Sequence, residues 1–241
     1  ALLSEENCLD IPIDQHARLN KDYFWCIDPL DGTLPFIEGR SGYAISVALV
    51  AKNGTPLLSA IYLPAIQFSY FTQIDNQGNT EIVKNGKNLL KHHKNQQQAF
   101  NFYCDQSFVH SDLYPPLIKQ LTKLVTQQNL HSLNVISEHG AVVNALSVLE
   151  NAPAVYIKLP KQQQGGGAIW DFSGTAVIAQ AKNSQRINEQ GLNGWVSDIH
   201  GSPLSLNQAD SYYMNQKGII YASDEKIARE VIKLCQALLT D

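Results

Sequence analysis

The strongest constraint on this chain is a short acidic turn that follows an apolar segment. Residues 25–36 read Trp-Cys-Ile-Asp-Pro-Leu-Asp-Gly-Thr-Leu-Pro-Phe. The apolar run 24–27 predicts a buried strand, and Pro29 predicts the end of regular pairing because proline has no backbone donor. We therefore expect Asp28 and Asp31 at the exit of a strand, where a turn lets both carboxylates converge on one point.

Two converging carboxylates repel each other unless a cation lies between them. Mg²⁺ prefers carboxylate oxygens, accepts a backbone carbonyl such as that of Leu30, and keeps positions open for phosphate oxygens. Gly32 permits close backbone approach, and the amides of Gly32 and Thr33 would bind an anion if a helical turn starts there. The turn thus predicts a site for metal and phosphate together, although an isolated Asp-Pro pair is more often a solvated turn.

Two further acidic segments lie far from this turn in the sequence. Ser4, Glu5 and Glu6 stand upstream, and Trp170 and Asp171 stand downstream at the opening of a predicted helix. An aspartate at a helix start is usually only an N-cap. Because it follows Trp170 and the other acidic segments are present, we favour a metal-ligand role for Asp171. The N-cap role is compatible with it, since one oxygen can face an ion while the other accepts free helix N–H groups.

The pattern of apolar residues divides the chain into two halves. Continuous or alternating apolar runs predict strands at Tyr43–Ala51, Leu57–Leu63 and Ile66–Phe71. A polar stretch from Asn85 to Gln98 follows. We place a domain boundary there, between an N-terminal sheet half (residues 1–97, with the Glu-Glu and Asp28–Thr33 motifs) and a C-terminal half (residues 98–241, with Trp-Asp).

Strands and helices alternate in the C-terminal half, which predicts an α/β architecture. The expected strands are 100–104, 133–137, 154–159 and 218–222. The expected helices are one opened by Pro115 and Pro116, one at 140–149, one opened by Asp171, and a terminal amphipathic helix after Ser223 as its N-cap.

Composition narrows the possible functions. The net charge is −4, from 18 basic and 22 acidic residues. The sequence contains no run of lysines and arginines that could bind along a nucleic-acid backbone. No apolar stretch approaches the ~18–20 residues of a membrane span, and residues 1–3 lead directly into acids, unlike a signal peptide. We expect a cytoplasmic protein with neither nucleic-acid polymer nor membrane as partner. Its scattered cysteines predict free thiols; they are Cys8, Cys26, Cys104 and Cys235.

Two other candidate sites are weaker. His92 and His93 lie among Lys and Gln residues, where a short His pair is more often solvated than metal-bound. Glycines 165–167 are not followed by Gly-Lys-Ser/Thr, so they do not form a Walker site, and a surface connection is the favoured interpretation.

The three acidic segments resemble the motifs of the inositol monophosphatase superfamily of metal-dependent, lithium-sensitive phosphatases. That group also includes bisphosphate nucleotidases and fructose bisphosphatases. Glu5-Glu6 is similar to its Gly-Glu-Glu, residues 28–33 to its Asp-Pro-(Ile/Leu)-Asp-Gly-Thr, and Trp170-Asp171 to its Trp-Asp. The resemblance covers nearly all of the chain and implies a layered α/β sandwich of helices and sheets.

The resemblance also implies roles for individual residues. The implied metal ligands are Glu5, Asp28, Asp31, Asp171 and the carbonyl of Leu30. Thr33 and Glu5 would orient the attacking water. The implied substrate contacts are Asp31, Gly32, Thr33, Gly140 and Ala141. Two or three Mg²⁺ ions, inhibition by Li⁺, and hydrolysis of a phosphomonoester without a covalent enzyme intermediate are expected on the same basis.

The sequence leaves the substrate open. The candidates are an inositol monophosphate and a 3'(2'),5'-bisphosphate nucleotide; the other class of function is a catalytically silent relative, or a subunit that needs a partner. Gly140-Ala141-Val142 stands where the family usually has Gly-Ser/Thr-Ala, so a substrate-facing hydroxyl is missing. The family also carries a helical segment before Glu-Glu, whereas Glu5 is almost the first residue here. The sequence is therefore either a fragment or a chain given without that segment, and the resemblance does not imply activity for the 241 residues alone. A homodimer is a further expectation from the resemblance.

Overall fold

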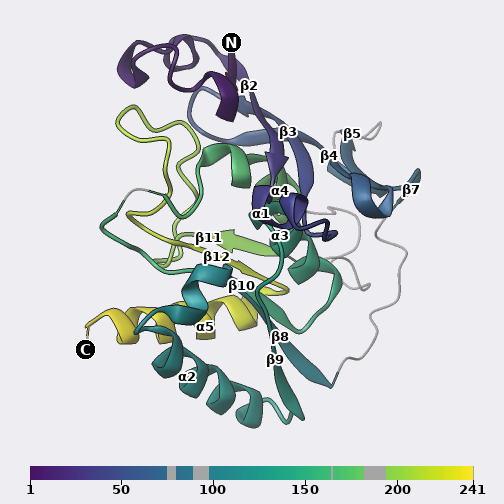
Figure 1. The fold of residues 1–241 in the computed structure, drawn as a ribbon, viewed down its shortest axis with the longest axis vertical. Helices are drawn as coiled ribbons and strands as arrows, with labels where there is room; N and C mark the ends of the chain where they lie inside the picture. The colour runs from purple at the N-terminus through teal and green to yellow at the C-terminus, as the bar shows by residue number, and fades with distance from the viewer. Residues whose placement is uncertain (75–79, 89–97, 164, 182–193, 241) are drawn as a thin grey trace.

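The first of two β-sheets is built from the N-terminal part of the chain (Figure 1). The computed structural model describes residues 1–74, 80–88, 98–163, 165–181 and 194–240. This seven-stranded sheet keeps the order of the sequence, with β1 parallel to β2 and the other pairs antiparallel. Its strands are β1 (Leu2–Ser4), β2 (Tyr23–Asp31), β3 (Ala44–Ala51), β4 (Pro56–Leu63), β5 (Phe68–Ile74), β6 (Thr80–Lys84) and β7 (Lys87–Asn88).

The second sheet has five strands in the order β11-β12-β10-β8-β9. Strand β8 runs parallel to its neighbours β9 and β10, whereas β12 runs antiparallel to β10 and β11. Parallel neighbours require crossover connections, and the helices of this half supply them. The strands are β8 (Ala99–Tyr103), β9 (Ser132–Ile136), β10 (Ala154–Lys158), β11 (Trp195–Ser197) and β12 (Ile219–Ala222).

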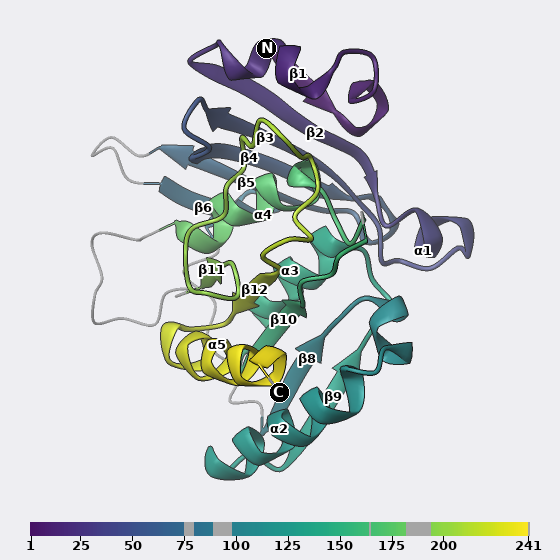
Figure 2. The same cartoon turned by 90° about the vertical axis from the view of Figure 1, so that its left-hand side faces the viewer.

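Helices and sheets alternate as layers (Figure 2). Helices α3 (Ala141–Glu150) and α4 (Ile169–Gln180) lie between the sheets, where α4 packs on β2, β3 and β4 and α3 packs on β10. Helices α2 (Tyr114–Gln127) and α5 (Glu225–Thr240) cover the far side of the second sheet. The short helix α1 (Thr33–Ile37) follows β2. The predicted α/β architecture of alternating layers is confirmed.

Two apolar clusters hold these layers together. The larger one joins the first sheet to α3 and α4, with Phe24, Val142 and Phe172 fully buried. The smaller one joins the second sheet to α2 and α5, with Leu121 and Cys235 fully buried. Helix α2 presents one apolar face to this cluster, and its buried residues are Leu117, Leu121, Leu124 and Val125.

The outer face of the first sheet remains exposed and apolar. Trp25 is 46% exposed, Tyr62 42% and Ile45 38%. Strand pairing sets Ile45 opposite Tyr62 and Trp25 opposite Leu49, so these side chains form one continuous surface. Strands that are apolar on both faces are typical of sheets covered on both sides, and α3 and α4 cover only the inner side.

Several predicted element boundaries change in the structure. Strand β5 begins at Phe68 rather than Ile66, because residues 64–66 form a 3₁₀ turn led by Pro64. Ser223 is not the N-cap of the last helix: its hydroxyl accepts the Ala154 amide (3.1 Å), while Asp224 Oδ1 accepts the amide of Ile227 (2.9 Å). Strands β1, β6, β7 and β11 were not predicted. The division into domains at residue 98 stays a prediction.

The cysteines match the prediction of free thiols. All four are unpaired, and only Cys8 is not buried. Burial raises the pKa of Cys26 to about 12, which keeps its thiol protonated at neutral pH. Among the described helices, none combines the length and apolar character needed to cross a membrane.

Candidate metal centre

Strand β2 bends within the acidic turn and ends at Asp31, so both aspartates lie at its exit as predicted. Asp28 pairs with Ser46 and Asp31 with Ala44, so β2 contains one extra residue relative to β3 between these pairs. The prediction that Pro29 ends the pairing is therefore wrong: a β-bulge interrupts the ladder and pairing resumes at Asp31. The bulge allows both carboxylates to point inward, and Asp28 and Asp31 are only 1% and 5% exposed.

The amino end of α3 holds the Asp31 carboxylate from the other half of the chain. The amide of Ala141 donates to Oδ1 (3.0 Å), and the amide of Val142 donates to Oδ2 (2.9 Å). These are amides of the first helical turn, which lack partners inside the helix and favour a negative charge. Asp31 is thus fixed through both oxygens, and the Ala141 amide expected to contact substrate is already engaged.

Three glycines let this helix end approach the turn after β2. A Cβ on Gly140 would overlap Asp31 Oδ2 and lie 2.7 Å from the Cα of Gly32. Gly32 itself has φ +82°, a left-handed conformation that side chains disfavour. The amide of Gly140 donates to the carbonyl of Gly42 (2.7 Å), which closes the contact. The close approach therefore requires glycine at these positions.

Asp171 enters the same space from α4. The helix begins at Ile169, so Asp171 is its third residue and does not open it as predicted. Its Oδ2 accepts the amide of Ala168 (2.9 Å), and its own amide donates to the Ala168 carbonyl (3.1 Å). One oxygen thus meets a backbone amide at the helix start, as expected, although as a side chain reaching back rather than as the N-cap.

These three aspartates form a compact acidic cluster. Asp28, Asp31 and Asp171 each offer a carboxylate oxygen, and these oxygens lie within 4.8 Å of one another. Burial raises the pKa of all three carboxyls, and the mutual repulsion of the charges raises those of Asp28 and Asp31 further. A buried group of hard oxygen donors that repel each other fits a divalent cation such as Mg²⁺ or Mn²⁺.

Glu5 lies beside the cluster rather than within it. It follows β1 in a 3₁₀ turn where Asn7 Oδ1 accepts the amide of Ser4 (2.7 Å). Burial raises the pKa of Glu5 most, and the charge of Asp171 raises it further. The Glu5 carboxyl therefore lies close enough to the cluster to interact with it electrostatically. Glu5 is more exposed than the three aspartates and is not one of the mutually close group.

The remaining predicted site residues lie along the turn after β2. Thr33 is the exposed first residue of α1, and its hydroxyl donates to the Leu30 carbonyl (3.4 Å). The amide of Leu30 donates to Asp28 Oδ1 (3.0 Å), which orients that carboxylate. These contacts tie the turn together without metal, and the metal and water roles of these residues stay predictions.

Sequence reasoning missed a partly buried cation near the cluster. Lys158 Nζ lies 2.8 Å from Asp105 Oδ2 and donates to the Gly166 carbonyl (2.7 Å). Its charge lowers the pKa of Asp171, in opposition to the larger effect of burial. The signal in the sequence is a lysine that ends an otherwise apolar strand, a pattern with many other causes.

The glycine run 165–167 forms part of the wall near Asp171. All three residues have positive φ, and a Cβ on Gly167 would lie 2.9 Å from Asp171 Oδ2. Gly166 and Lys158 also line a cavity of about 310 Å³ that extends along the end of β10. The glycines therefore provide close packing rather than a Walker loop. The His92-His93 pair lies outside the described residues.

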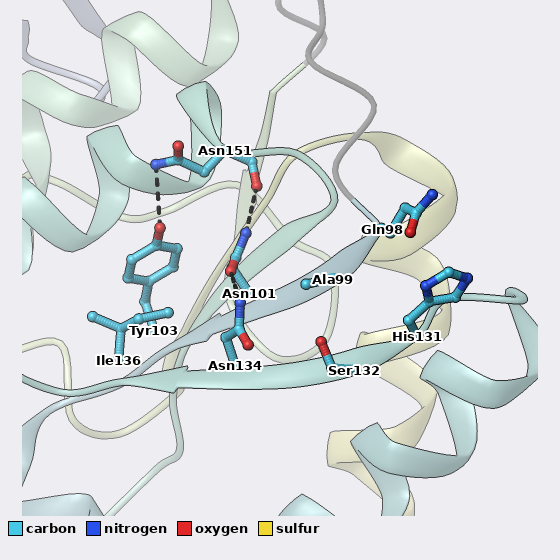
Figure 3. A pocket seen from close by; sticks show the side chains of 9 residues that line it. All are labelled: Gln98, Ala99, Asn101, Tyr103, His131, Ser132, Asn134, Ile136 and Asn151. Carbon is cyan, nitrogen blue, oxygen red and sulfur yellow. Dashed lines mark hydrogen bonds between the residues drawn. The ribbon is translucent and has the colours of Figure 1, made fainter.

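A larger hollow on the second sheet is separate from this centre (Figure 3). Its side chains bond to each other: Asn134 Nδ2 donates to Asn101 Oδ1 (3.0 Å), and Asn151 Nδ2 donates to the Tyr103 hydroxyl (3.2 Å). Asn151 follows the carboxyl end of α3, whereas the acidic cluster lies at its amino end. A helix of this length separates the two by about 15 Å, so the hollow is not part of the metal centre.

The fold and the site define an α/β protein of two sheets separated by helices, with buried carboxylates that could hold a divalent cation. Comparison with known proteins gives the family. The model of the inositol monophosphatase family matches residues 1–239, and the chain belongs to this family. It is therefore a phosphatase, and enzymes of this family depend on metal ions.

Named relatives and solved structures agree with this assignment. The chain is 25% identical over 210 residues to a 3'(2'),5'-bisphosphate nucleotidase CysQ of Haemophilus influenzae, covering 87% of this chain and 67% of that protein. A 3'(2'),5'-bisphosphate nucleotidase of Schizosaccharomyces pombe is 24% identical, with 89% and 59% covered. The fold is similar to inositol monophosphatase-II of Staphylococcus aureus (TM-score 0.67, 18% identity), with 99% of this chain and 77% of that chain covered.

Proposed function

We propose that this protein is a Mg²⁺-dependent phosphomonoesterase that hydrolyses a small phosphorylated metabolite. The observation that carries the proposal is the buried convergence of Asp28, Asp31 and Asp171 on one point. Charges packed this closely are stable together only with a counter-cation or with bound protons. A metal-dependent phosphatase requires such a centre, and the relatives support this reaction class.

In this proposal the acidic residues form the ligand set of the metal ions. Asp28, Asp31 and Asp171 hold two or three Mg²⁺ ions, with Glu5 and the Leu30 carbonyl completing the ligand set. Mg²⁺, when bound, polarises the phosphoryl oxygens and makes water a stronger nucleophile. The Ala141 and Val142 amides keep Asp31 oriented during the reaction, since they hold both of its oxygens. Inhibition by Li⁺ is part of the proposal.

Thr33 and Glu5 orient the attacking water. Both residues are exposed at the edge of the cluster, where water can reach them. The Thr33 hydroxyl donates to the Leu30 carbonyl, which leaves its oxygen free to accept a hydrogen bond from water. Partial burial and the charge of Asp171 raise the pKa of Glu5, which makes its carboxylate a stronger base towards water.

The cavity at the end of β10 favours an ester whose alcohol carries a second anionic group. Gly166 and Lys158 line it next to the Gly167–Asp171 contact. Lys158 is paired there with Asp105, and Lys161 adds a second cation. Phe108 and Met214 supply apolar surface opposite these charges. Cations beside an apolar wall suit a bisphosphate nucleotide better than an inositol monophosphate, whose alcohol part is uncharged.

The alternative is a relative that binds metal or phosphate without turnover, or a subunit that needs a partner. Gly32, Gly140 and Ala141 are proposed substrate contacts in either case. We also propose a cytoplasmic location and a small molecule, rather than a nucleic-acid polymer or a membrane, as the ligand. Mg²⁺ binding without release of phosphate is the result that would favour the alternative.

One experiment tests reaction class and substrate together. Release of phosphate from a nucleoside 3',5'-bisphosphate and from inositol monophosphate is measured with Mg²⁺ and with EDTA. We expect Mg²⁺-dependent release, faster for the bisphosphate. Lys161→Met should raise KM for the bisphosphate more than for inositol monophosphate, and equal changes would contradict the proposed role of the cavity. No release from any ester would refute the enzyme activity.

A further inference from the structure

A buried arginine outside the acidic cluster connects the N-terminal segment to a loop of the C-terminal half. Arg18 is completely buried in a 3₁₀ turn, Ala17–Leu19, of the segment between β1 and β2. Within the described residues, no carboxylate pairs with this guanidinium. A buried unpaired charge is costly, and packing alone would be served equally well by an apolar side chain.

The partners of the Arg18 guanidinium all belong to one loop in the C-terminal half. Its guanidinium donates to the Asn207 side-chain oxygen and to the Gln208 carbonyl (2.7 Å for the latter). It also lies over the ring of Tyr212, 5.2 Å from the ring centre, at a distance typical of cation–π contact. Arg18 therefore fixes residues 207–212 against the N-terminal segment.

The same loop forms the support of Asp171. The Tyr212 carbonyl accepts the amide of Ile169 (2.9 Å), and the Met214 amide donates to the Gly167 carbonyl (3.0 Å). Between these two bonds lies Ala168, whose amide holds Asp171 Oδ2. The loop thus sets the backbone that orients this carboxylate.

An aromatic contact reinforces this support. Tyr212 packs on Trp170, the residue directly before Asp171, with ring centres 5.7 Å apart. On the other side, the turn that carries Arg18 packs on β1, the strand that ends directly before Glu5. Glu5 and Asp171 are the two acidic residues of the site that lie outside the strands of the first sheet. Arg18 and Tyr212 therefore connect the segments that carry them.

We infer that Arg18 is a positioning residue for the metal centre, acting through Tyr212 and the Gly167–Ile169 backbone on Asp171. This inference rests on the proposed function, since it concerns the geometry of the ligand set. Its consequence is that Mg²⁺ affinity depends on a guanidinium that touches neither metal nor substrate. Loss of such supporting contacts typically costs 10- to 100-fold in metal affinity.

The test measures Mg²⁺ binding by titration calorimetry, alongside thermal unfolding of the same samples. Arg18→Lys keeps the charge but loses the forked geometry, and Tyr212→Leu loses the ring; each should weaken Mg²⁺ binding about tenfold or more. Tyr212→Phe keeps the ring and should stay within about threefold of the wild type. Leu121→Ala is the control, because it removes core packing in the other cluster and should lower stability without changing Mg²⁺ affinity.

The outcomes separate this inference from the proposed function. Wild-type Mg²⁺ affinity in folded Arg18→Lys and Tyr212→Leu would overturn the positioning role and leave the phosphatase proposal intact. An equal loss of affinity in Leu121→Ala would also overturn it, since the effect would then follow stability alone. Absence of Mg²⁺ binding in the wild type would overturn both proposals. If Arg18→Lys does not fold, Tyr212→Leu against Tyr212→Phe decides the question.

Discussion

Asp31 is the residue on which the site depends most, because it joins the first sheet to α3. Both of its oxygens accept helix amides, and one of them also lies in the carboxylate cluster. Asp31→Asn should lower Mg²⁺-dependent turnover by at least about 100-fold, since a neutral amide is a poor Mg²⁺ ligand. The free energy of unfolding should change by only about 1 kcal/mol, because one acceptor oxygen remains.

The measurements for Asp31→Asn are phosphate release and chemical unfolding of the same preparation. The control variant is Asp224→Asn, since Asp224 caps α5 far from the cluster. That control should keep both its stability and its turnover, because asparagine caps a helix about as well as aspartate. Retention of most turnover by Asp31→Asn would refute the role assigned to this carboxylate.

Gly140 gives a second test at the scale of single atoms. An alanine methyl group there would overlap Asp31 Oδ2 and crowd Gly32. Gly140→Ala should move α3 away from the turn and weaken Mg²⁺ binding at least tenfold. Gly39→Ala is the control: nothing lies within 4 Å of its Cβ position, and only its positive φ of 68° imposes strain. It should cost about 1 kcal/mol of stability and leave Mg²⁺ binding unchanged, as measured by calorimetry.

At the scale of elements, the carboxylate cluster couples folding to pH and to metal. Burial raises the pKa of Asp28, Asp31 and Asp171 in the metal-free fold, so the folded chain binds more protons than the unfolded chain above about pH 4. The free energy of unfolding should therefore fall as pH rises through the raised pKa range.

Mg²⁺ should reverse this trend, because it displaces the bound protons and binds the folded state. An excess of 100 times Kd adds about 2.7 kcal/mol, and affinity should increase with pH. Thermal unfolding at pH 6 and pH 8, with and without Mg²⁺, measures both effects. A Mg²⁺-induced rise in Tm that is larger at pH 6 than at pH 8 would contradict this coupling.

The outer face of the first sheet makes a separate prediction. Trp25, Ile45 and Tyr62 expose apolar surface on neighbouring strands, and exposed patches of this kind promote association. The 241-residue chain should therefore self-associate as concentration rises, in sedimentation velocity. A Trp25→Glu, Tyr62→Glu double variant should shift the chain towards monomer. Sedimentation independent of concentration in the unsubstituted chain would show that this face does not drive association.

The sequence predicted the elements whose stability is local. Strands β3, β4 and β10 have continuous apolar runs, and α2 has a clear apolar face, so their own pattern defines them. Strand β1 has three residues and β7 two, and such short strands exist only through pairing with a neighbour. The bulge at Pro29 depends on the register of β3, which the residues of β2 do not determine.

The same distinction between local and long-range interactions explains which site residues could be predicted. Asp28 and Asp31 share one turn, so their convergence follows from a local motif, and a family resemblance supplied Asp171. The Ala141 and Val142 amides bind Asp31 only because α3 is set against the turn by the packing of Gly32 and Gly140. Lys158 and Arg18 were not predictable as site residues, because their importance lies in what surrounds them.

For the whole molecule, the central claim is that carboxylates from the first sheet and from α4 hold divalent cations between them. The two layers meet at the acidic cluster, and no single half of the chain contains it. The metal centre can therefore form only when both halves of the chain are folded and packed together.

The most direct measurement is the anomalous scattering of Mn²⁺ in crystals of the protein grown with this ion. The account predicts a strong peak within about 2.5 Å of an oxygen from each of Asp28, Asp31 and Asp171, and no peak there in Asp171→Asn crystals. Mn²⁺ bound only elsewhere, or no peak among these oxygens at saturating Mn²⁺, would contradict it.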